Sequence, residues 1–209
     1  MNIKVCGMKY PDNIKELGKL PIHFMGMIFY PKSPRFVGSL TLSDLNSALP
    51  PYIERVGVFV NESIEYIIEK TNLYNLNLIQ LHGNESVEFC EELSKAMPII
   101  KAFNVSKPAD FEQTKSYEDS CSYFLFDTKT PQYGGSGQKF DWEILSEYRG
   151  NTSFFLSGGI SVEDADSIKQ INHPKFYGID LNSKFEIAPG LKDIEQLQQF
   201  IKALRDEQD

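Results

Sequence analysis

The sequence predicts an α/β fold in which eight parallel strands close into a single (β/α)8 barrel over residues 1–209. Short apolar runs of strand length alternate eight times with segments of helical periodicity. Several of the runs end directly on a residue with useful side-chain chemistry, and such barrels gather their site at the carboxyl ends of the strands. The clearest case is Tyr123–Phe126, which ends on Asp127 ahead of the glycine-rich loop Gly134–Gly137. No interdomain linker or low-complexity segment interrupts the alternation.

Composition excludes several classes of protein. Hydrophobic residues make up 41% of the 209 positions, which suits a chain with one good core. The net charge is -8 and the 21 basic residues are scattered among 29 acidic ones, so nucleic acid is not an expected partner. No apolar stretch is long enough for a signal peptide or a membrane span, and we expect a cytoplasmic protein. The three cysteines, Cys6, Cys90 and Cys121, lack metal-ligand spacing and are expected to be thiols.

The eight strands are expected at short apolar runs bounded by polar or turn residues. They are Ile3–Cys6, Ile22–Phe29, Val56–Val60, Leu78–Leu81, Ile99–Phe103, Tyr123–Phe126, Phe154–Leu156 and Phe176–Ile179. Such unbroken apolar runs are typical of parallel strands covered on both faces.

Helix start signals follow most of the strands. Pro11 favours the first turn of a helix, Asn61 is a favourable N-cap, and Ser161 with Asp164 forms a pattern resembling a capping box. The segment after the fifth strand has the least clear pattern. Helical spacing places the following apolar side chains toward the core: Ile14, Leu17, Leu20, Leu42, Leu45, Leu49, Ile64, Ile67, Ile68, Val87, Cys90, Leu93, Met97, Trp142, Ile144, Leu145, Ala165, Ile168, Ile171, Ile194, Leu197, Ile201 and Leu204.

Three residues at strand ends form the candidate reactive centre. Cys6 ends the first strand, His82 follows the fourth and Asp127 ends the sixth. Alternate residues of a strand share a face, so Lys4 points the same way as Cys6 and its ammonium is expected to favour a thiolate that can act as a base. Each residue also has a structural interpretation: a small buried Cys6, an Asp127 that caps the next loop, and a His82 that hydrogen-bonds within the barrel mouth.

A phosphate site is predicted at the loops after strands seven and eight. Gly158 and Gly159 precede a capped helix, whose free amides and dipole attract anions, and Asn182 and Ser183 supply the second half. Gly135, in the loop after strand six, is placed with them as a phosphate ligand. A glycine pair is also common in an ordinary tight turn.

Arg35 is the candidate residue for binding a carboxylate group. It lies in a loop stiffened by two prolines, where a guanidinium binds a carboxylate through two hydrogen bonds. The alternative is a solvated surface charge. His23 and His173 are interpreted as structural.

Motifs along almost the whole chain carry a resemblance to the phosphoribosylanthranilate isomerases of tryptophan biosynthesis. They are Lys4–Met8 (KVCGM), Phe29–Arg35 (FYPKSPR), Gln80–Gly83 (QLHG), Phe126–Lys129 (FDTK), Gly134–Gly137 (GGSG), Phe140–Trp142 (FDW), Ser157–Ile160 (SGGI) and Pro189–Gly190. Together these motifs are highly specific for the family.

The resemblance implies a (β/α)8 barrel without cofactor or metal that catalyses the Amadori rearrangement of N-(5-phosphoribosyl)anthranilate. It implies a small phosphoribosyl substrate, with Cys6 as general base and Asp127 as general acid, in a monomer or weak homodimer. The loop after the eighth strand departs from the family, because Lys184 stands where a glycine is usual. This puts the local backbone path in doubt, although Lys184 adds positive charge beside a phosphate.

Two other functions remain open at this point. One is another phosphosugar enzyme on the same barrel, such as a pentulose phosphate epimerase or the indole-forming neighbours in the pathway, which would not need Cys6, Arg35 and Asp127 together. The other is a phosphate-binding protein without catalysis, favoured only by the altered loop at Lys184.

Overall fold

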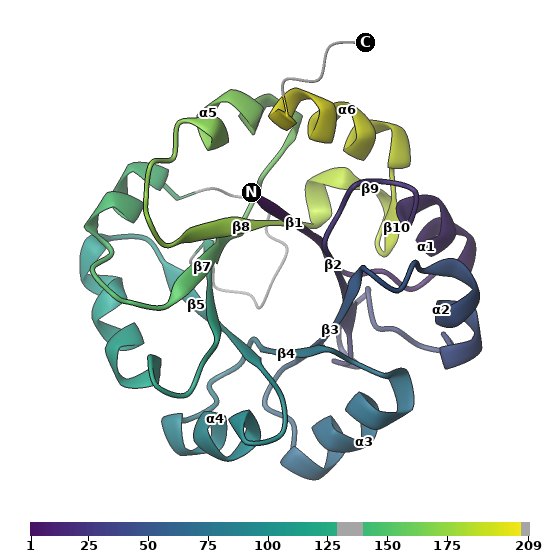
Figure 1. The fold of residues 1–209 in the computed structure, drawn as a ribbon, viewed down its shortest axis with the longest axis horizontal. Helices are drawn as coiled ribbons and strands as arrows, with labels where there is room; N and C mark the ends of the chain where they lie inside the picture. Colours follow the sequence, from purple (N-terminus) through teal and green to yellow (C-terminus); the bar gives the residue numbers. More distant parts are fainter. Residues whose placement is uncertain (129–139, 206–209) are drawn as a thin grey trace.

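The computed structural model describes residues 1–128 and 140–205 and shows a closed barrel of parallel strands in the order β1 to β8 (Figure 1). The strands are β1 (Asn2–Val5), β2 (Phe24–Ile28), β3 (Glu54–Phe59), β4 (Leu78–Leu81), β5 (Ile99–Val105), β6 (Tyr123–Thr128), β7 (Ser153–Leu156) and β8 (Phe176–Leu181). β1 pairs with β8 in parallel and closes the ring, with Lys4 opposite Asp180. The predicted fold class is confirmed.

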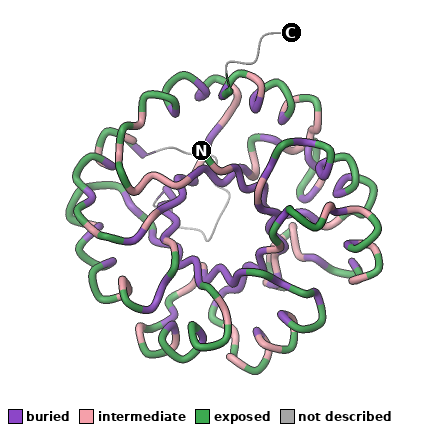
Figure 2. Tube along the Cα trace, viewed as in Figure 1, coloured by how far each residue is buried: buried purple, intermediate pink, exposed green. Residues whose placement is uncertain are grey.

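The barrel has an inner and an outer apolar layer. Seven buried side chains fill the interior between the strands: Phe24, Val56, Leu78, Ile100, Ala102, Leu125 and Phe155. A larger cluster lies between the strands and the surrounding helices. Figure 2 shows the resulting pattern, a buried ring of strands within helices that are exposed on their outer sides. Each large apolar side chain buried in this way contributes about 1.5–3 kcal/mol, so the barrel is a rigid frame for its loops.

Helices surround the strands in chain order. The α-helices are α1 (Pro11–Leu17), α2 (Leu42–Ala48), α3 (Ile64–Tyr74), α4 (Val87–Ser94), α5 (Ala165–Lys169) and α6 (Ile194–Arg205). The 3-10 helices are η1 (Pro108–Tyr117), η2 (Trp142–Glu147), η3 (Val162–Asp164) and η4 (Ser183–Phe185). Pro11 does begin α1, and Ser161 with Asp164 does form the capping box expected from the sequence, here on η3.

Two local predictions differ from the structure. Asn61 is not the N-cap of α3; that position belongs to Ser63, whose hydroxyl accepts from the N–H of Tyr66. Asn61 instead adopts a left-handed backbone with φ 53, and its side chain accepts from the N–H of Asn84 in the next loop. The helix expected around Trp142 is a single 3-10 segment, η2.

An additional two-stranded antiparallel sheet follows β8, which the sequence did not predict. It consists of β9 (Glu186–Ala188) and β10 (Leu191–Lys192), and it lies beside α1 (Figure 1). The main chain of Lys192 makes two hydrogen bonds to the side chain of Asn13 in α1, at 2.7 and 3.0 Å. This small sheet is therefore fixed to the barrel wall.

Within the described part of the chain, none of the helices combines the length and apolar character needed to cross a membrane. His23 and His173 accept main-chain N–H groups through Nδ1, as their structural interpretation requires. Cys90 and Cys121 are buried in the larger apolar cluster between the strands and the helices.

Candidate active site

The inward side chains at the carboxyl ends of the strands form a compact polar cluster. Lys4 of β1 is fully buried, and its Nζ lies 2.8 Å from Oδ1 of Asp180 on the neighbouring β8. Cys6 follows Lys4 on the same face and is 3% exposed. Lys4, Cys6, Asp180, Asp127 and His82 are near enough to influence one another's charge. The structure thus brings the three predicted strand-end residues to one mouth.

The protonation of Cys6 differs from the prediction. Burial raises the pKa of the thiol above its ordinary value, and Asp180 raises it further, whereas Lys4 and Lys192 lower it. The ammonium of Lys4 does favour the thiolate, as expected, but it is shared with the carboxylate of Asp180, so burial prevails. In the unliganded protein Cys6 is therefore held mainly as a thiol.

Lys4 and Asp180 form the buried ion pair of this cluster. Burial alone would lower the pKa of Lys4, but Asp180 and Cys6 raise it, so its ammonium stays charged. Burial raises the pKa of Asp180, and Lys4 opposes that shift. Asp180 was not among the predicted site residues, although it lies at the end of β8 as Asp127 does at the end of β6.

Asp127 is held from two sides. Its Oδ1 accepts the N–H of Thr128 at 2.8 Å, and its Oδ2 lies 3.4 Å from Nε2 of His82. His82 in turn accepts from Nε2 of Gln80 at 3.0 Å through its Nδ1. This bond places the imidazole proton on Nε2, facing the carboxylate. Gln80, His82 and Asp127 therefore form a chain of contacts that leads from the buried interior to the mouth.

We expect Gln80→Leu to lower kcat/KM by about fivefold, the equivalent of one neutral hydrogen bond of about 1 kcal/mol. The proton of His82 would no longer be fixed on Nε2, so Asp127 would no longer face a fixed N–H group. Stability should be unchanged or higher, because Oε1 of Gln80 is buried without a hydrogen-bond partner among the described residues. Steady-state kinetics and thermal unfolding on the same preparation test both parts. An unfolding temperature that falls together with activity would contradict this role.

The predicted phosphate loop after β7 lies beside Asp127. Gly158 and Gly159 have φ of 92 and 67, and a side chain on Gly158 would meet Oδ1 of Asp127 at 2.7 Å. Only glycine allows this backbone and this close approach. In the described part of the chain, the N–H groups of Gly158 and Gly159 have no hydrogen-bond acceptor. These donors are therefore open to a ligand at the mouth. Gly135 lies outside the described residues.

The loop after β8 accommodates Lys184 without a left-handed backbone at that position. Ser183–Phe185 forms η4, and within residues 1–128 and 140–205 the only non-glycine residues with positive φ are Asn61 and Asn75. The local path thus has no need of glycine at position 184, where the side chain is exposed. Asn182 accepts from Nζ of Lys192 at 2.7 Å through its side-chain oxygen.

Arg35 is not a solvated surface charge. Its Nε and Nη2 donate to both carboxylate oxygens of Glu186 at 2.7–2.9 Å, and its side chain is 14% exposed. Glu186 also accepts from Nζ of Lys192 at 2.7 Å. The sequence analysis missed Glu186 and Lys192, because charged residues in a short segment after β8 have the pattern of an ordinary surface loop.

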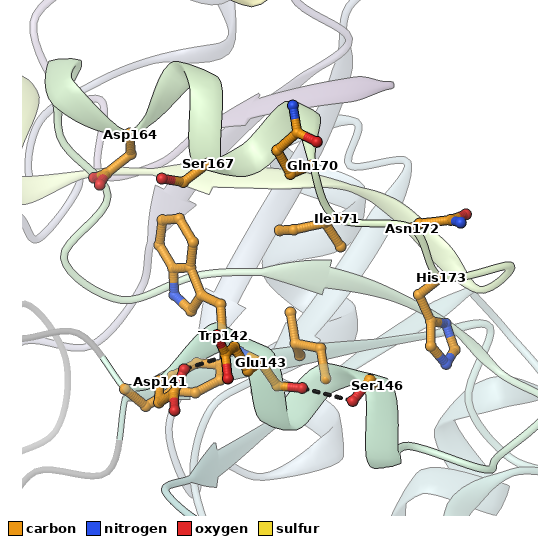
Figure 3. A pocket seen from close by; sticks show the side chains of 12 residues that line it. Asp141, Trp142, Glu143, Ser146, Asp164, Ser167, Gln170, Ile171, Asn172 and His173 are labelled. Carbon is orange, nitrogen blue, oxygen red and sulfur yellow. Dashed lines mark hydrogen bonds between the residues drawn. The ribbon is translucent and has the colours of Figure 1, made fainter.

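A separate pocket of about 560 Å³ lies between η2 and the α5 segment, among the outer helices. Figure 3 shows the indole of Trp142 directed from η2 toward Asp164 and Ser167 on the opposite wall. None of the predicted site residues lines this pocket. The polar cluster at the strand ends remains the candidate active site.

Comparison with known proteins agrees with this arrangement. Residues 3–203 match the family described as N-(5'phosphoribosyl)anthranilate (PRA) isomerase. The chain is 50% identical over 208 residues to the N-(5'-phosphoribosyl)anthranilate isomerase of Parabacteroides distasonis, covering 98% of this chain and 93% of that one.

Solved structures give the same result. The phosphoribosyl anthranilate isomerase of Thermus thermophilus superposes with a TM-score of 0.88 at 28% identity, over 100% of both chains. A phosphoribosyl anthranilate isomerase in complex with reduced 1-(o-carboxyphenylamino)-1-deoxyribulose 5-phosphate superposes with a TM-score of 0.81 at 32% identity, over 99% of both chains. Sequence and structure together lead to one conclusion: the chain belongs to the N-(5'-phosphoribosyl)anthranilate isomerase family.

Proposed function

We propose that residues 1–209 form a single catalytic domain, an isomerase that converts N-(5-phosphoribosyl)anthranilate to 1-(2-carboxyphenylamino)-1-deoxyribulose 5-phosphate in tryptophan biosynthesis. The observation that carries the mechanism is the meeting of a buried thiol, Cys6, and a carboxyl group, Asp127, around one ion pair. An Amadori rearrangement needs one group that gives a proton and one that removes a proton, and no redox step.

The reaction begins with opening of the ribose ring. Asp127 as general acid gives a proton to the ring oxygen while the bond from that oxygen to C1 breaks. The nitrogen lone pair forms the C1–N double bond, which leaves a protonated Schiff base. Cys6 as general base then removes the C2 proton, and the electrons of that C–H bond form an enolamine. The enolamine then gains a proton at C1 and loses the proton of its C2 hydroxyl, which gives the ketone.

The substrate supplies the charge that Cys6 needs. Burial keeps Cys6 mainly as a thiol before the reaction. A protonated Schiff base beside the thiol is an opposite charge, which favours the thiolate. The cation formed in the first step therefore promotes ionisation of Cys6, whose proton passes to the carboxylate that ring opening leaves on Asp127. The resulting thiolate is the base for the second step. Lys4 and Lys192 contribute in the same direction.

The two ends of the substrate are assigned to different residues of the mouth. We assign the phosphate to Gly158, Gly159, Asn182 and Ser183, with Gly135 as a further ligand from outside the described residues. Open backbone amides at the glycines support this assignment. We assign the anthranilate carboxylate to Arg35, and we place His82 against the substrate beside Asp127.

The proposed function is tested by turnover of freshly generated N-(5-phosphoribosyl)anthranilate, followed as loss of aminobenzoate fluorescence. The wild-type protein should remove the signal and Cys6→Ser should not. A folded wild-type protein that binds phosphate but leaves the signal unchanged would instead indicate a binding protein or another phosphosugar substrate.

We expect Arg35→Lys to raise KM by about 10- to 100-fold and to leave kcat within a few-fold of wild type. Lysine keeps the charge but loses the paired hydrogen bonds to a carboxylate, each worth about 1.5–3 kcal/mol when charged. Steady-state kinetics measure the split. Arg149→Lys, an exposed position, is the matched control. If Arg35→Lys lowered kcat and left KM unchanged, Arg35 would not be the residue that binds the carboxylate.

We further propose that the reaction proceeds without cofactor or metal, in the cytoplasm, in a monomer or weak homodimer. The phosphoribosylanthranilate isomerase of Thermotoga maritima, a relative at 32% identity, is dimeric. Sedimentation of the purified protein across a concentration series distinguishes the two assembly states.

A further inference from the structure

The small sheet after β8 contributes two buried charged residues, Glu186 and Lys192. The side chain of Glu186 is 4% exposed and that of Lys192 is 0% exposed. Buried ions are costly unless their partners satisfy them. Glu186 is satisfied by Arg35, by Lys192 and by the N–H of Gly190 at 3.0 Å. The two charges are therefore bound to Arg35 as one group.

The geometry points to a role for this group in substrate selection: we propose that Glu186 and Lys192 are positioning residues that orient Arg35 toward the carboxylate of the substrate. This inference rests on the proposed function, because it takes Arg35 as the partner of that carboxylate.

The pairing leaves one edge of the guanidinium available. A guanidinium has five N–H donors. Glu186 takes Nε–H and one hydrogen of Nη2, which is one edge of the fork. The outer edge, with both hydrogens of Nη1 and the second of Nη2, has no acceptor within residues 1–128 and 140–205. A second carboxylate can bind end-on to this edge while Glu186 holds the other.

The side-chain stem of Arg35 lies near the proposed reacting centre. Gly7, which follows Cys6, has φ 80, and a side chain there would meet Cδ of Arg35 at 2.8 Å and Oδ1 of Asn182 at 2.9 Å. The arginine stem and the Asn182 side chain thus lie together against Gly7, the residue directly after the proposed base. A carboxylate on Arg35 would therefore bind close to Cys6 and to Asn182.

Lys192 keeps the group attractive to an anion. Burial lowers the pKa of Lys192, and Glu186 opposes that shift. With Lys192 as the ammonium that Glu186 binds at 2.7 Å, the charges of Arg35, Glu186 and Lys192 sum to one positive charge. Burial would raise the pKa of Glu186, yet Arg35, Lys192 and the Gly190 N–H lower it, so the carboxylate stays ionised. Lys192 also donates to the side-chain and main-chain oxygens of Asn182 at 2.7 and 3.3 Å. It therefore connects the carboxylate end of the site to the phosphate end.

The test compares two substrates, N-(5-phosphoribosyl)anthranilate and the corresponding phosphoribosyl aniline, which lacks the carboxylate. Ketose formation is followed by chromatography, so both substrates give the same readout. In Glu186→Gln, KM for the carboxylated substrate should rise at least tenfold with kcat little changed, while kcat/KM for the aniline compound stays near wild type. Glu112→Gln, an exposed ion-pair position, is the matched control.

Two further variants keep the test decisive. Glu186→Asp retains the charge on a shorter stem and should shift KM in the same direction by less, so it decides the matter if Glu186→Gln does not fold. In an Arg35→Lys background, Glu186→Gln should cause no further loss of discrimination. Equal losses on both substrates, or no change, would overturn the inference. A wild-type protein that converts neither substrate would instead overturn the proposed function.

Discussion

Cys6→Ser is expected to lower kcat by about 10²- to 10⁴-fold, the usual contribution of one positioned proton transfer. Serine has nearly the same shape, but its hydroxyl does not ionise in the range where a thiol does. KM should change little, because Cys6 is assigned to proton removal and the ends of the substrate are held elsewhere. Single-turnover measurements that separate binding from chemistry would show this split.

Cys121→Ser is the matched control for that variant, since it makes the same change at another buried cysteine, one that is not among the residues assigned to the site. It should keep its turnover. Similar losses in both variants would point to damage to the core and not to a missing base.

The dependence of kcat/KM on pH is an independent test of Cys6 as the general base. Burial raises the pKa of the thiol, so the basic form is scarce at neutral pH and increases as pH rises. The value of kcat/KM, which reports the free enzyme, should therefore increase with pH beyond the ordinary range of a thiol and fall as pH decreases. A profile that is already flat below neutral pH would contradict Cys6 as the base.

Asp127→Asn should lower kcat by a similar factor, about 10²- to 10⁴-fold. The amide cannot give a proton to the ribose ring oxygen, so ring opening would become the slow step. The fold should be retained, because the amide oxygen can still accept the N–H of Thr128 as Oδ1 does now. The measurement is turnover of N-(5-phosphoribosyl)anthranilate together with binding of a product analogue.

Asp119→Asn, at an exposed position, is the control for this change. Binding of the analogue near wild-type strength with turnover lost would assign Asp127 to the chemical step. If both Cys6→Ser and Asp127→Asn kept near wild-type turnover, the acid–base assignment would be wrong.

The strands were predictable because their signal is local. Each is an unbroken apolar run, and the polar residue at its end follows from the pleat, which alternates faces. This reasoning located Cys6, His82 and Asp127 at one mouth. The same reasoning applied to β8 would have found Asp180.

Other features could not be predicted because they depend on distant partners. Asn61 has the residue type of an N-cap, but Ser63 takes that role while Asn61 turns toward the loop at Asn84. The sign of the Cys6 shift depends on how Lys4 is shared with Asp180, which a single strand does not reveal. The buried position of Lys192 depends on contacts with Asn13, which is distant in the sequence, and with Glu186, which lies across the turn between β9 and β10.

The pairing of Arg35 with Glu186 has a consequence for how the protein is made. The two residues are 151 positions apart, and Lys4 and Asp180 are 176 apart. Contacts between such distant segments require closure of most of the chain and form late in folding. During synthesis, the amino-terminal half of the mouth leaves the ribosome long before the residues that neutralise its charges. A partly made chain therefore holds Lys4 and Arg35 without their acidic partners, and the site becomes functional only when almost the whole polypeptide is present.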